Sequence, residues 1–195
     1  TLTQMLGREF QAQLVLEQFN DNPFLPRFYQ NPQRYSFTLE MSFLTERYHQ
    51  LINELDSRDM FTSFILADYY FMKSLIFAKT NLEGDEYKLY RRVFDIMFKQ
   101  LPRPDLYVYL HASVDKLMEQ IQNRGRSFEK PIQHDYLKKL QDNYFNYFKQ
   151  FPNNRFLIID TESIDYVKKT QDYEWVKHVI FNKKYDIGIN RVSPD

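Results

Sequence analysis

Two acidic residues stand where predicted strands of this chain end. Glu17 follows the short apolar run Leu14–Leu16, and Asp68 follows the β-favouring run Thr62–Ala67. In open parallel sheets, ligands bind beyond the carboxyl ends of the strands. Carboxylates at that edge could serve as a general base and as a Mg²⁺ ligand. Each acid could equally be an ordinary loop residue, so the pattern alone leaves both interpretations open.

A pair of arginines closes another unit of the predicted sheet. Residues 106–110 form an apolar strand pattern, and Ser113 is placed to cap a helix that ends in Arg124-Gly125-Arg126. The apolar stripe of that helix consists of Val114, Leu117, Met118 and Ile121. Guanidinium groups present rigid forks of donors that match phosphate oxygens. We therefore expect Arg124 and Arg126 to grip a phosphate.

A long helix is predicted around Tyr35–Leu55, and it carries two different lines of side chains. The first line is apolar at helical spacing and indicates core packing: Phe37, Met41, Leu44, Tyr48 and Leu51. The second line mixes polar and aromatic residues: Ser36, Glu40, Phe43 and Arg47. Such a face is usually solvated. If it lines a cleft instead, it offers a carboxylate, a ring and a guanidinium to one flat polar ligand.

The composition argues against several classes of function. The 195 residues suit one domain with a core of its own, and 26 basic residues balance 26 acidic ones. A chain without net charge has no field that would attract nucleic acid in general. The absence of cysteine excludes a disulfide framework and a thiolate metal site, and the four histidines lack metal-ligand spacing. No apolar run approaches the roughly 20 residues of a membrane-spanning helix, and we expect a cytoplasmic protein.

The order of the predicted elements indicates an α/β fold. Strand patterns alternate with helical ones at residues 14–16, 62–67, 106–110 and 155–159. The first helix covers 1–10 and is expected to close near Gly7, and the tail 182–195 is expected to be loose. Because the chain opens directly in a helix, we expect the first strand of the sheet and the loop after it to lie upstream of Thr1.

Four stretches together form a specific combination: LVLEQF, FYQNPQRYSFTLEMSFLTER, SLIFAK, and NRGRSFE with the helix that follows. With them the chain resembles the deoxynucleoside kinases of the P-loop kinase superfamily, relatives of thymidylate kinase, and especially the bacterial purine deoxynucleoside kinases. The resemblance implies a three-layer α/β fold, a parallel sheet with flanking helices, over residues 1–181. It also implies ATP-dependent phosphorylation of a deoxynucleoside 5′-hydroxyl in nucleotide salvage, with Mg²⁺, by a homodimer.

The resemblance assigns the residues around the nucleoside. Glu17 matches the general base that takes the proton of the 5′-hydroxyl. Tyr29 and Glu129 match a pair that binds the 3′-hydroxyl, which would discriminate against sugars that lack it. Phe77 matches the ring that stacks on the base, a role compatible with core packing. Arg47 matches an arginine near the base and the catalytic acid.

The same resemblance assigns the phosphate and nucleotide contacts. Arg124 and Arg126 match the lid arginines that clamp the transferred phosphoryl group, whose charge spreads over its oxygens in the transition state. Asp165 and Tyr166 match an acidic and aromatic turn that holds the adenine of ATP. Asp68 is the expected Mg²⁺ ligand.

The chain departs from the family pattern at three places. The glycine-rich phosphate loop is absent, and TLTQMLG resembles the residues just after it. Asp68-Tyr69 stands where the family has an acid followed by arginine, so the cationic role would pass to Lys73, to Arg47 or to the lid arginines. Glu40 stands where the family has a glutamine that contacts the base.

Glu40 bears on which base is preferred. An ionised carboxylate only accepts hydrogen bonds, which suits the N1–H and N2–H₂ edge of guanine more than the mixed edge of adenine. Arg47 could instead neutralise Glu40 and restore donors. We expect a purine, with guanine slightly favoured. The alternatives are a nucleoside monophosphate kinase of the thymidylate kinase type and a non-catalytic nucleotide-binding relative.

Overall fold

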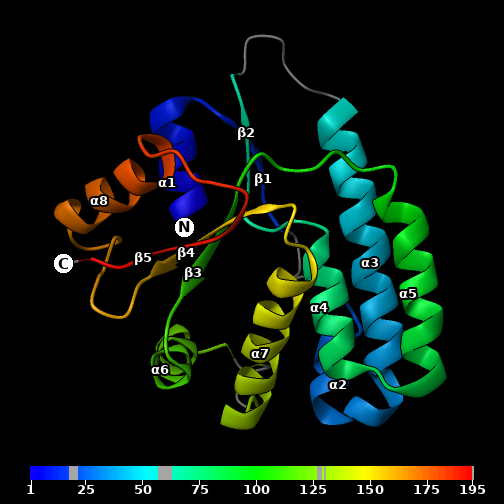
Figure 1. Cartoon of the computed structure of the whole chain (residues 1–195). Coiled ribbons are helices and arrows are strands. Elements are labelled where there is room, and N and C mark those ends of the chain that lie inside the picture. Colours follow the sequence, from blue (N-terminus) through cyan, green and yellow to red (C-terminus); the bar gives the residue numbers. More distant parts are fainter. Residues whose placement is uncertain (18–21, 57–62, 127–128, 130, 195) are drawn as a thin grey trace. The chain divides into compact units, whose positions relative to one another are not determined.

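The computed structural model describes residues 1–17, 22–56, 63–126, 129 and 131–194, and its elements alternate as an α/β chain should (Figure 1). The helices are α1 (Leu2–Phe10), α2 (Leu25–Gln30), α3 (Pro32–Asp56), α4 (Met72–Asn81), α5 (Gly84–Phe98), α6 (Val114–Arg124), α7 (His134–Gln150) and α8 (Thr170–Phe181). The strands are β1 (Gln13–Val15), β2 (Ile65–Ala67), β3 (Tyr107–His111), β4 (Arg155–Asp160) and β5 (Gly188–Val192).

Every strand pair in the described residues is parallel. β1 pairs with β2, and β3, β4 and β5 form a second sheet in that order. Parallel neighbours need long crossover connections, which the helices between the strands supply. The predicted α/β class, with parallel strands and flanking helices, is therefore confirmed, and β1 to β4 fall on the four predicted strand patterns.

The prediction of a loose tail is wrong for residues 188–192. They form β5 and pair with β4 from Arg155↔Gly188 to Ile159↔Val192. The side-chain amide of Asn190 adds bonds to the backbone oxygens of Phe156 (3.2 Å) and Asp186 (2.8 Å). Side chains of β5 alternate between half-buried and exposed, so the segment lacks the continuous apolar run by which a buried parallel strand is recognised.

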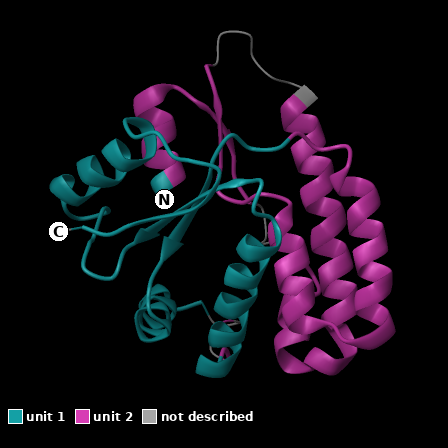
Figure 2. Cartoon of the chain, in the orientation of Figure 1, with its two compact units in different colours: residues 1–2, 103–126, 133–195 teal, residues 3–102, 127–132 magenta. Residues whose placement is uncertain are grey.

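The chain divides into two compact units, each described here by itself (Figure 2). Unit 2 comprises the described residues of 3–102 and 127–132, and unit 1 comprises those of 1–2, 103–126 and 133–195. Neither unit contains a described helix that is long and apolar enough to cross a membrane.

The core of unit 2 is an aromatic stack between helices. Phe71, Phe94 and Phe98 stack with ring centroids 5.0 Å apart for the first two and 5.2 Å for the last two. Such pairs contribute roughly 0.5–1.5 kcal/mol each beyond the burial of their surface. Leu44 and Leu51 of the predicted apolar line are also buried. This packing holds α3, α4 and α5 side by side (Figure 1).

In unit 1 the central strand is fully buried and the helix after β3 has both predicted ends. Residues 156–159 of β4 are buried, as are Phe148 of α7 and Val176 and Val179 of α8, and the ring centroids of Phe148 and Phe156 lie 4.6 Å apart. Ser113 caps α6 by accepting a hydrogen bond from the backbone N–H of Lys116 (3.2 Å), as predicted. Gly125 ends α6 in the left-handed conformation, with φ +68°.

The prediction that the first helix ends near Gly7 is wrong, because α1 continues to Phe10. Gly7 lies inside α1 because it faces Leu14 of β1: a Cβ at position 7 would lie 2.9 Å from Leu14 Cγ. The helix ends where Gln11 takes a positive φ of 51° and the N–H of Ala12 returns to the Gly7 oxygen. The glycine serves close packing against β1.

This close contact predicts that the effect of Gly7→Ala on the free energy of unfolding depends on the Leu14 side chain. Gly7→Ala should lower the free energy of unfolding by about 1–3 kcal/mol, because the added methyl overlaps the Leu14 side chain. In a Leu14→Ala background the same change should be neutral or should stabilise by roughly 0.5–1 kcal/mol, since alanine favours the helix. Urea denaturation of the four proteins measures both effects. An equal cost of Gly7→Ala in both backgrounds would refute the contact.

Candidate active site

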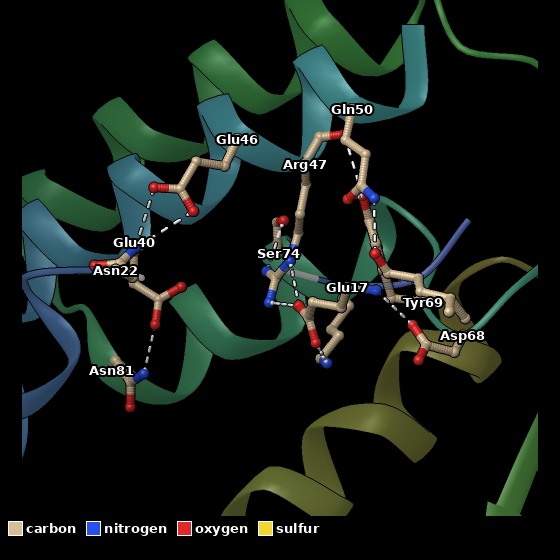
Figure 3. Close-up of polar contacts among 12 residues, drawn as sticks. Glu17, Asn22, Glu40, Glu46, Arg47, Gln50, Asp68, Tyr69, Ser74 and Asn81 are labelled. Atoms are coloured by element: carbon tan, nitrogen blue, oxygen red, sulfur yellow. Dashed lines mark hydrogen bonds and ion pairs between the residues drawn. The ribbon is translucent and has the colours of Figure 1, made fainter. Parts of the chain in front are cut away.

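Glu17 lies directly beyond the end of β1, as predicted. Its backbone N–H donates to Asp68 Oδ1 (3.0 Å), and the N–H of Asp68 donates to the oxygen of Val15 (3.1 Å). The parallel register that pairs Val15 with Ala67 places the two acids at the same edge of the sheet (Figure 3). The prediction from strand ends is therefore confirmed for their position.

The carboxylate of Glu17 is held between two cations. Arg47 donates to Oε1 from Nε (2.9 Å) and from Nη2 (2.6 Å), and Lys73 Nζ donates to Oε2 at 2.5 Å. Burial alone would raise the pKa of Glu17, but the charges of Lys73 and Arg47 outweigh it and lower this pKa below its ordinary value. Glu17 is therefore ionised at neutral pH.

The Arg47 side chain is held by hydrogen bonds and by two aromatic rings. Its side chain is 5% exposed, and Nη1 donates to Ser74 Oγ (2.9 Å). The guanidinium carbon lies 4.9 Å from the centre of the Phe43 ring and 5.8 Å from that of Tyr69. Contacts of this kind between a guanidinium and aromatic faces are favourable. Arg47 is thus a rigid partner of Glu17.

Glu40 is a buried carboxyl seven residues before Arg47, on the same face of α3. It is 1% exposed, and Asn81 Nδ2 donates to its Oε1 at 2.6 Å (Figure 3). Its Oε2 is buried and has no hydrogen-bond partner among the described residues. Burial raises the pKa of Glu40 to about 7, against the lowering effects of the Asn81 bond and the charges of Arg47 and Lys73. Neutral and ionised forms are both populated near neutral pH.

The mixed line of α3 is therefore not a solvated face. Ser36, Glu40 and Arg47 are all buried, and Phe43 is half-buried. Helical periodicity shows which side chains share a face but not what covers it. That this face serves a ligand stays a prediction.

Tyr69, which replaces an expected arginine, anchors the end of β1 instead. Its hydroxyl donates to Gln50 Oε1 (2.7 Å), and Gln50 Nε2 donates to the backbone oxygen of Leu16 (2.7 Å). Besides Arg47, the cation that contacts Glu17 is Lys73. Lys73 is one of the candidates to replace the missing arginine, but it is not a predicted site residue. Lys73 lies one helical turn before Phe77 on α4, with its ammonium 5.6 Å from the ring centre. The spacing of four residues between Lys73 and Phe77 on one predicted helix was the signal in the sequence that could have identified Lys73 as a site residue.

Asp68 is exposed and suits a cation that brings most of its own ligands. The described residues contain no group of three or more His, Asp or Glu that could hold a metal ion. Mg²⁺ in nucleotide sites usually needs just one or two carboxylates beside the phosphates and water. One oxygen of Asp68 already accepts the N–H of Glu17, which fixes the orientation of the carboxylate.

Tyr29 and Glu129 both belong to unit 2, the unit of Glu17. Tyr29 lies half-buried on α2 with its ring 5.1 Å from that of Phe28, and Glu129 is 7% exposed. A buried acid and a phenol suit the recognition of a hydroxyl, and their joint contact to one sugar oxygen stays a prediction.

The remaining predicted residues belong to unit 1. Arg124 is the last residue of α6 and lines a cavity of about 440 Å³ bounded by β3, α6 and α7, and Arg126 follows the glycine cap. The carboxylate of Asp165 accepts the N–H groups of Val167 (3.2 Å) and Lys168 (3.1 Å) and so shapes its own turn. Their contacts to nucleotide, and any action together with Glu17, stay predictions.

Comparison with known proteins identifies the family. The family model described as deoxynucleoside kinase matches residues 1–184. Deoxyguanosine kinase of Bacillus subtilis (strain 168) is 35% identical over 178 residues, which cover 89% of this chain and 86% of the relative. Deoxyadenosine kinase of Lactobacillus acidophilus is 26% identical over 202 residues and covers 96% of this chain and 92% of its own length.

Solved structures agree in fold. Deoxyadenosine kinase from M. mycoides with bound dCTP superposes with a TM-score of 0.77 at 22% identity, covering 93% of this chain and 92% of the other. The family model and the relatives confirm the sequence-based prediction of a deoxynucleoside kinase. The chain belongs to the deoxynucleoside kinase family.

Proposed function

We propose that this chain transfers the γ-phosphoryl group of ATP to the 5′-hydroxyl of a purine deoxynucleoside in nucleotide salvage. The observation that carries the proposal is the ionised carboxylate of Glu17 at the carboxyl edge of the β1–β2 sheet, held by Arg47 and Lys73. Family membership supplies the reaction class. The expected place of the enzyme in the cytoplasm remains a prediction.

Glu17 acts as the general base in this proposal. The 5′-oxygen forms a bond to the γ-phosphorus while the bond from that phosphorus to the bridging oxygen of ADP breaks. The hydroxyl proton passes to Glu17. A lowered pKa keeps the acid in the form that can accept this proton at neutral pH. The rigid contacts of Arg47 orient the carboxylate.

The predicted nucleotide contacts complete this scheme. Mg²⁺ bound with ATP would neutralise phosphate charge, and Asp68 would hold it, directly or through water. Arg124 and Arg126 stabilise the charge on the transferred group, where catalysis is mostly positioning and electrostatics. Asp165 and Tyr166 support the adenine of ATP.

Tyr29, Glu129 and Phe77 would hold the acceptor. A neutral sugar needs no basic patch for a phosphate of its own, and the stretch FYQNPQRYSFTLE is of the type that binds a sugar hydroxyl. This favours a deoxynucleoside over a nucleoside monophosphate, which is the alternative substrate class.

Glu40 and Asn81 support a purine as the base. Glu40 Oε2 is a buried polar atom that finds no partner in the described residues and so is suited to a ligand. In its neutral form Glu40 can both donate and accept, as glutamine does. In its ionised form it only accepts, which suits the N1–H and N2–H₂ groups of guanine. We propose that guanine is favoured more strongly as the pH rises through 7. The relatives named deoxyguanosine and deoxyadenosine kinase are consistent with a purine.

Replacing the base tests the proposed chemistry. Glu17→Gln should lower kcat/KM for the preferred deoxynucleoside about 10²–10⁴-fold, because the amide cannot take a proton, while nucleoside affinity stays within a few-fold. Steady-state kinetics with ATP and calorimetric binding without it measure the two effects. Glu83→Gln, an exposed acid at the start of α5, is the matched control and should leave both unchanged. Turnover near the wild-type rate in Glu17→Gln would remove Glu17 from the mechanism.

Replacing Glu40 tests both the base preference and the buried titration. The ratio of kcat/KM for deoxyguanosine to that for deoxyadenosine should rise between pH 6 and 8.5 in the wild type, about in step with ionisation near pH 7. Glu40→Gln should flatten this dependence and favour deoxyadenosine. A ratio that is the same at every pH and in both proteins would show that Glu40 does not read the base.

The same variant has a stability readout independent of activity. The pKa of Glu40 is raised on folding from 4.5 to about 7, so the folded state binds more protons than the unfolded state between these values. Stability from this group is present below pH 4.5 and is lost as the pH rises through 7, by up to about 3 kcal/mol. Glu40→Gln should therefore gain stability relative to wild type from pH 5 to pH 8.5 in urea denaturation. A constant difference would contradict the raised pKa.

We also propose a homodimer that packs through α5. Leu89 and Ile96 are large, exposed and seven residues apart on that helix, and so share one face. Light scattering should give twice the chain mass of 23.9 kDa for the wild type and the single-chain mass for Leu89→Glu/Ile96→Glu. Ile187→Glu, at a similarly exposed position of unit 1, is the control and should stay dimeric. A monomeric wild type would refute the proposal.

A further inference from the structure

We propose that Lys73 is a catalytic residue that changes partners during the reaction. In the structure the ammonium of Lys73 donates to Glu17 Oε2. On substrate binding it yields that oxygen to the 5′-hydroxyl and donates instead to the oxygens of the incoming phosphoryl group. The inference rests on the proposed function and adds a residue that the family resemblance does not assign.

Both oxygens of the Glu17 carboxylate already accept hydrogen bonds from cations. Oε1 of Glu17 accepts two bonds from Arg47, and Oε2 accepts the bond from Lys73. Asp68 holds the backbone N–H of Glu17, so the acid is also restrained from turning as a whole. A hydroxyl that is to lose its proton must come within hydrogen-bond reach of one of these oxygens. Oε1 already accepts two bonds and Oε2 only one, so Oε2 is the oxygen that the hydroxyl can reach, and Lys73 is the cation with which the hydroxyl competes.

Of the two cations that bind Glu17, Lys73 is the one able to move. Arg47 is 5% exposed, is bonded to Ser74 and lies against two aromatic rings, so displacing it would leave a buried guanidinium without these contacts. The Lys73 side chain is 24% exposed, and within the described residues its ammonium donates to Glu17 alone. A lysine is a point charge on a flexible stem with three rotatable donors, whereas arginine is a planar fork.

The net charge of the cluster around Glu17 changes during the proposed reaction. With all three groups ionised, Glu17, Arg47 and Lys73 together carry one excess positive charge, although burial lowers the pKa of Lys73. Two further acids act on these cations, the exposed Asp68 at the same edge of the sheet and the buried Glu40. When Glu17 takes the proton it becomes neutral, and two neighbouring cations are left without their carboxylate. The transferred phosphoryl oxygens bring the negative charge that replaces it. A cation that is free to follow this charge stabilises the transition state more than the ground state.

The position of Lys73 on α4 fits this role. Its ammonium lies 5.6 Å from the ring centre of Phe77, the predicted stacking partner of the base. Both residues are half-buried and lie one turn apart on the same face of the helix. This face therefore presents a ring for the base and, beside Glu17, a cation for the reacting end of the nucleoside.

The test compares Lys73→Met with Lys79→Met in the full chain. Lys79 is the matched control, since it is an exposed lysine of the same helix whose ammonium also lies over a ring, 4.7 Å from the centre of Tyr87. Lys73→Met should lower kcat about 10²–10³-fold, the loss typical of removing one preorganised charge stabiliser. Nucleoside affinity without ATP should stay within threefold or become tighter. Lys79→Met should match wild type in both measurements.

The pH profile separates this role from a purely structural one. The ammonium of Lys73 lowers the pKa of Glu17, so its removal should move the acidic limb of kcat/KM to higher pH. Lys73→Arg should recover part of kcat and restore the limb, because the charge returns. If Lys73→Met fails to fold, Lys73→Gln against Lys73→Arg decides in the same way: the charged variant should be the faster by tenfold or more.

Two outcomes would overturn the inference. One is a kcat for Lys73→Met within threefold of wild type. The other is an unchanged kcat with a large loss of nucleoside affinity, which would make Lys73 a binding residue. Failure of the proposed function has a different signature, namely a wild-type protein that phosphorylates no deoxynucleoside, or a fully active Glu17→Gln.

Discussion

The structure of the site depends on one carboxylate that is shared by two buried or half-buried cations. Glu17 compensates the charge of Arg47, which is almost completely withdrawn from water, and Arg47 and Lys73 in turn keep Glu17 ionised despite its own burial. Breaking such a cluster from either side leaves an uncompensated charge in a poorly solvated place. The three residues are thus a unit, and a change to any one of them alters the protonation of the others.

The backbone around this cluster is held by side chains from neighbouring parts of the chain. Asp68 fixes the N–H of Glu17, and the chain of bonds from Tyr69 through Gln50 to the oxygen of Leu16 fixes the residue before it. The aromatic stack between α4 and α5 fixes the helix that carries Lys73. A reacting group must be held to within a fraction of an ångström, and rigid elements with a second layer of hydrogen bonds achieve this more readily than loops do.

Local signals in the sequence predicted much of this arrangement. The apolar runs of β1 and β2 end at Glu17 and Asp68, and a serine before an amphipathic stripe marked the start of α6, because strand ends and helix caps are decided by neighbouring residues. What depends on distant parts of the chain was missed. The bond of Lys73 to Glu17 joins residues 56 positions apart, and periodicity on α3 could not tell that Glu40 would be covered.

Two other errors have the same physical origin. β5 has an alternating pattern of exposure, which resembles a loop when its partner strand is unknown. Glycine commonly stands just after the end of a helix, so Gly7 predicts a helix end there. In the folded chain Gly7 instead makes room for the Leu14 side chain, a contact that the sequence does not reveal. In both cases a residue pattern has two physical causes, and tertiary packing decides between them.

The bond between Asn81 and Glu40 has an evolutionary consequence. Codons for glutamate and glutamine differ by a single nucleotide, and the Asn81 amide can donate to the Oε1 atom of either residue without any change in the surrounding helices. If Glu40 reads the base, as proposed above, a single exchange of glutamate for glutamine would change the preferred purine without loss of fold. Enzymes of this kind that differ in their preferred purine need not be separated by long divergence.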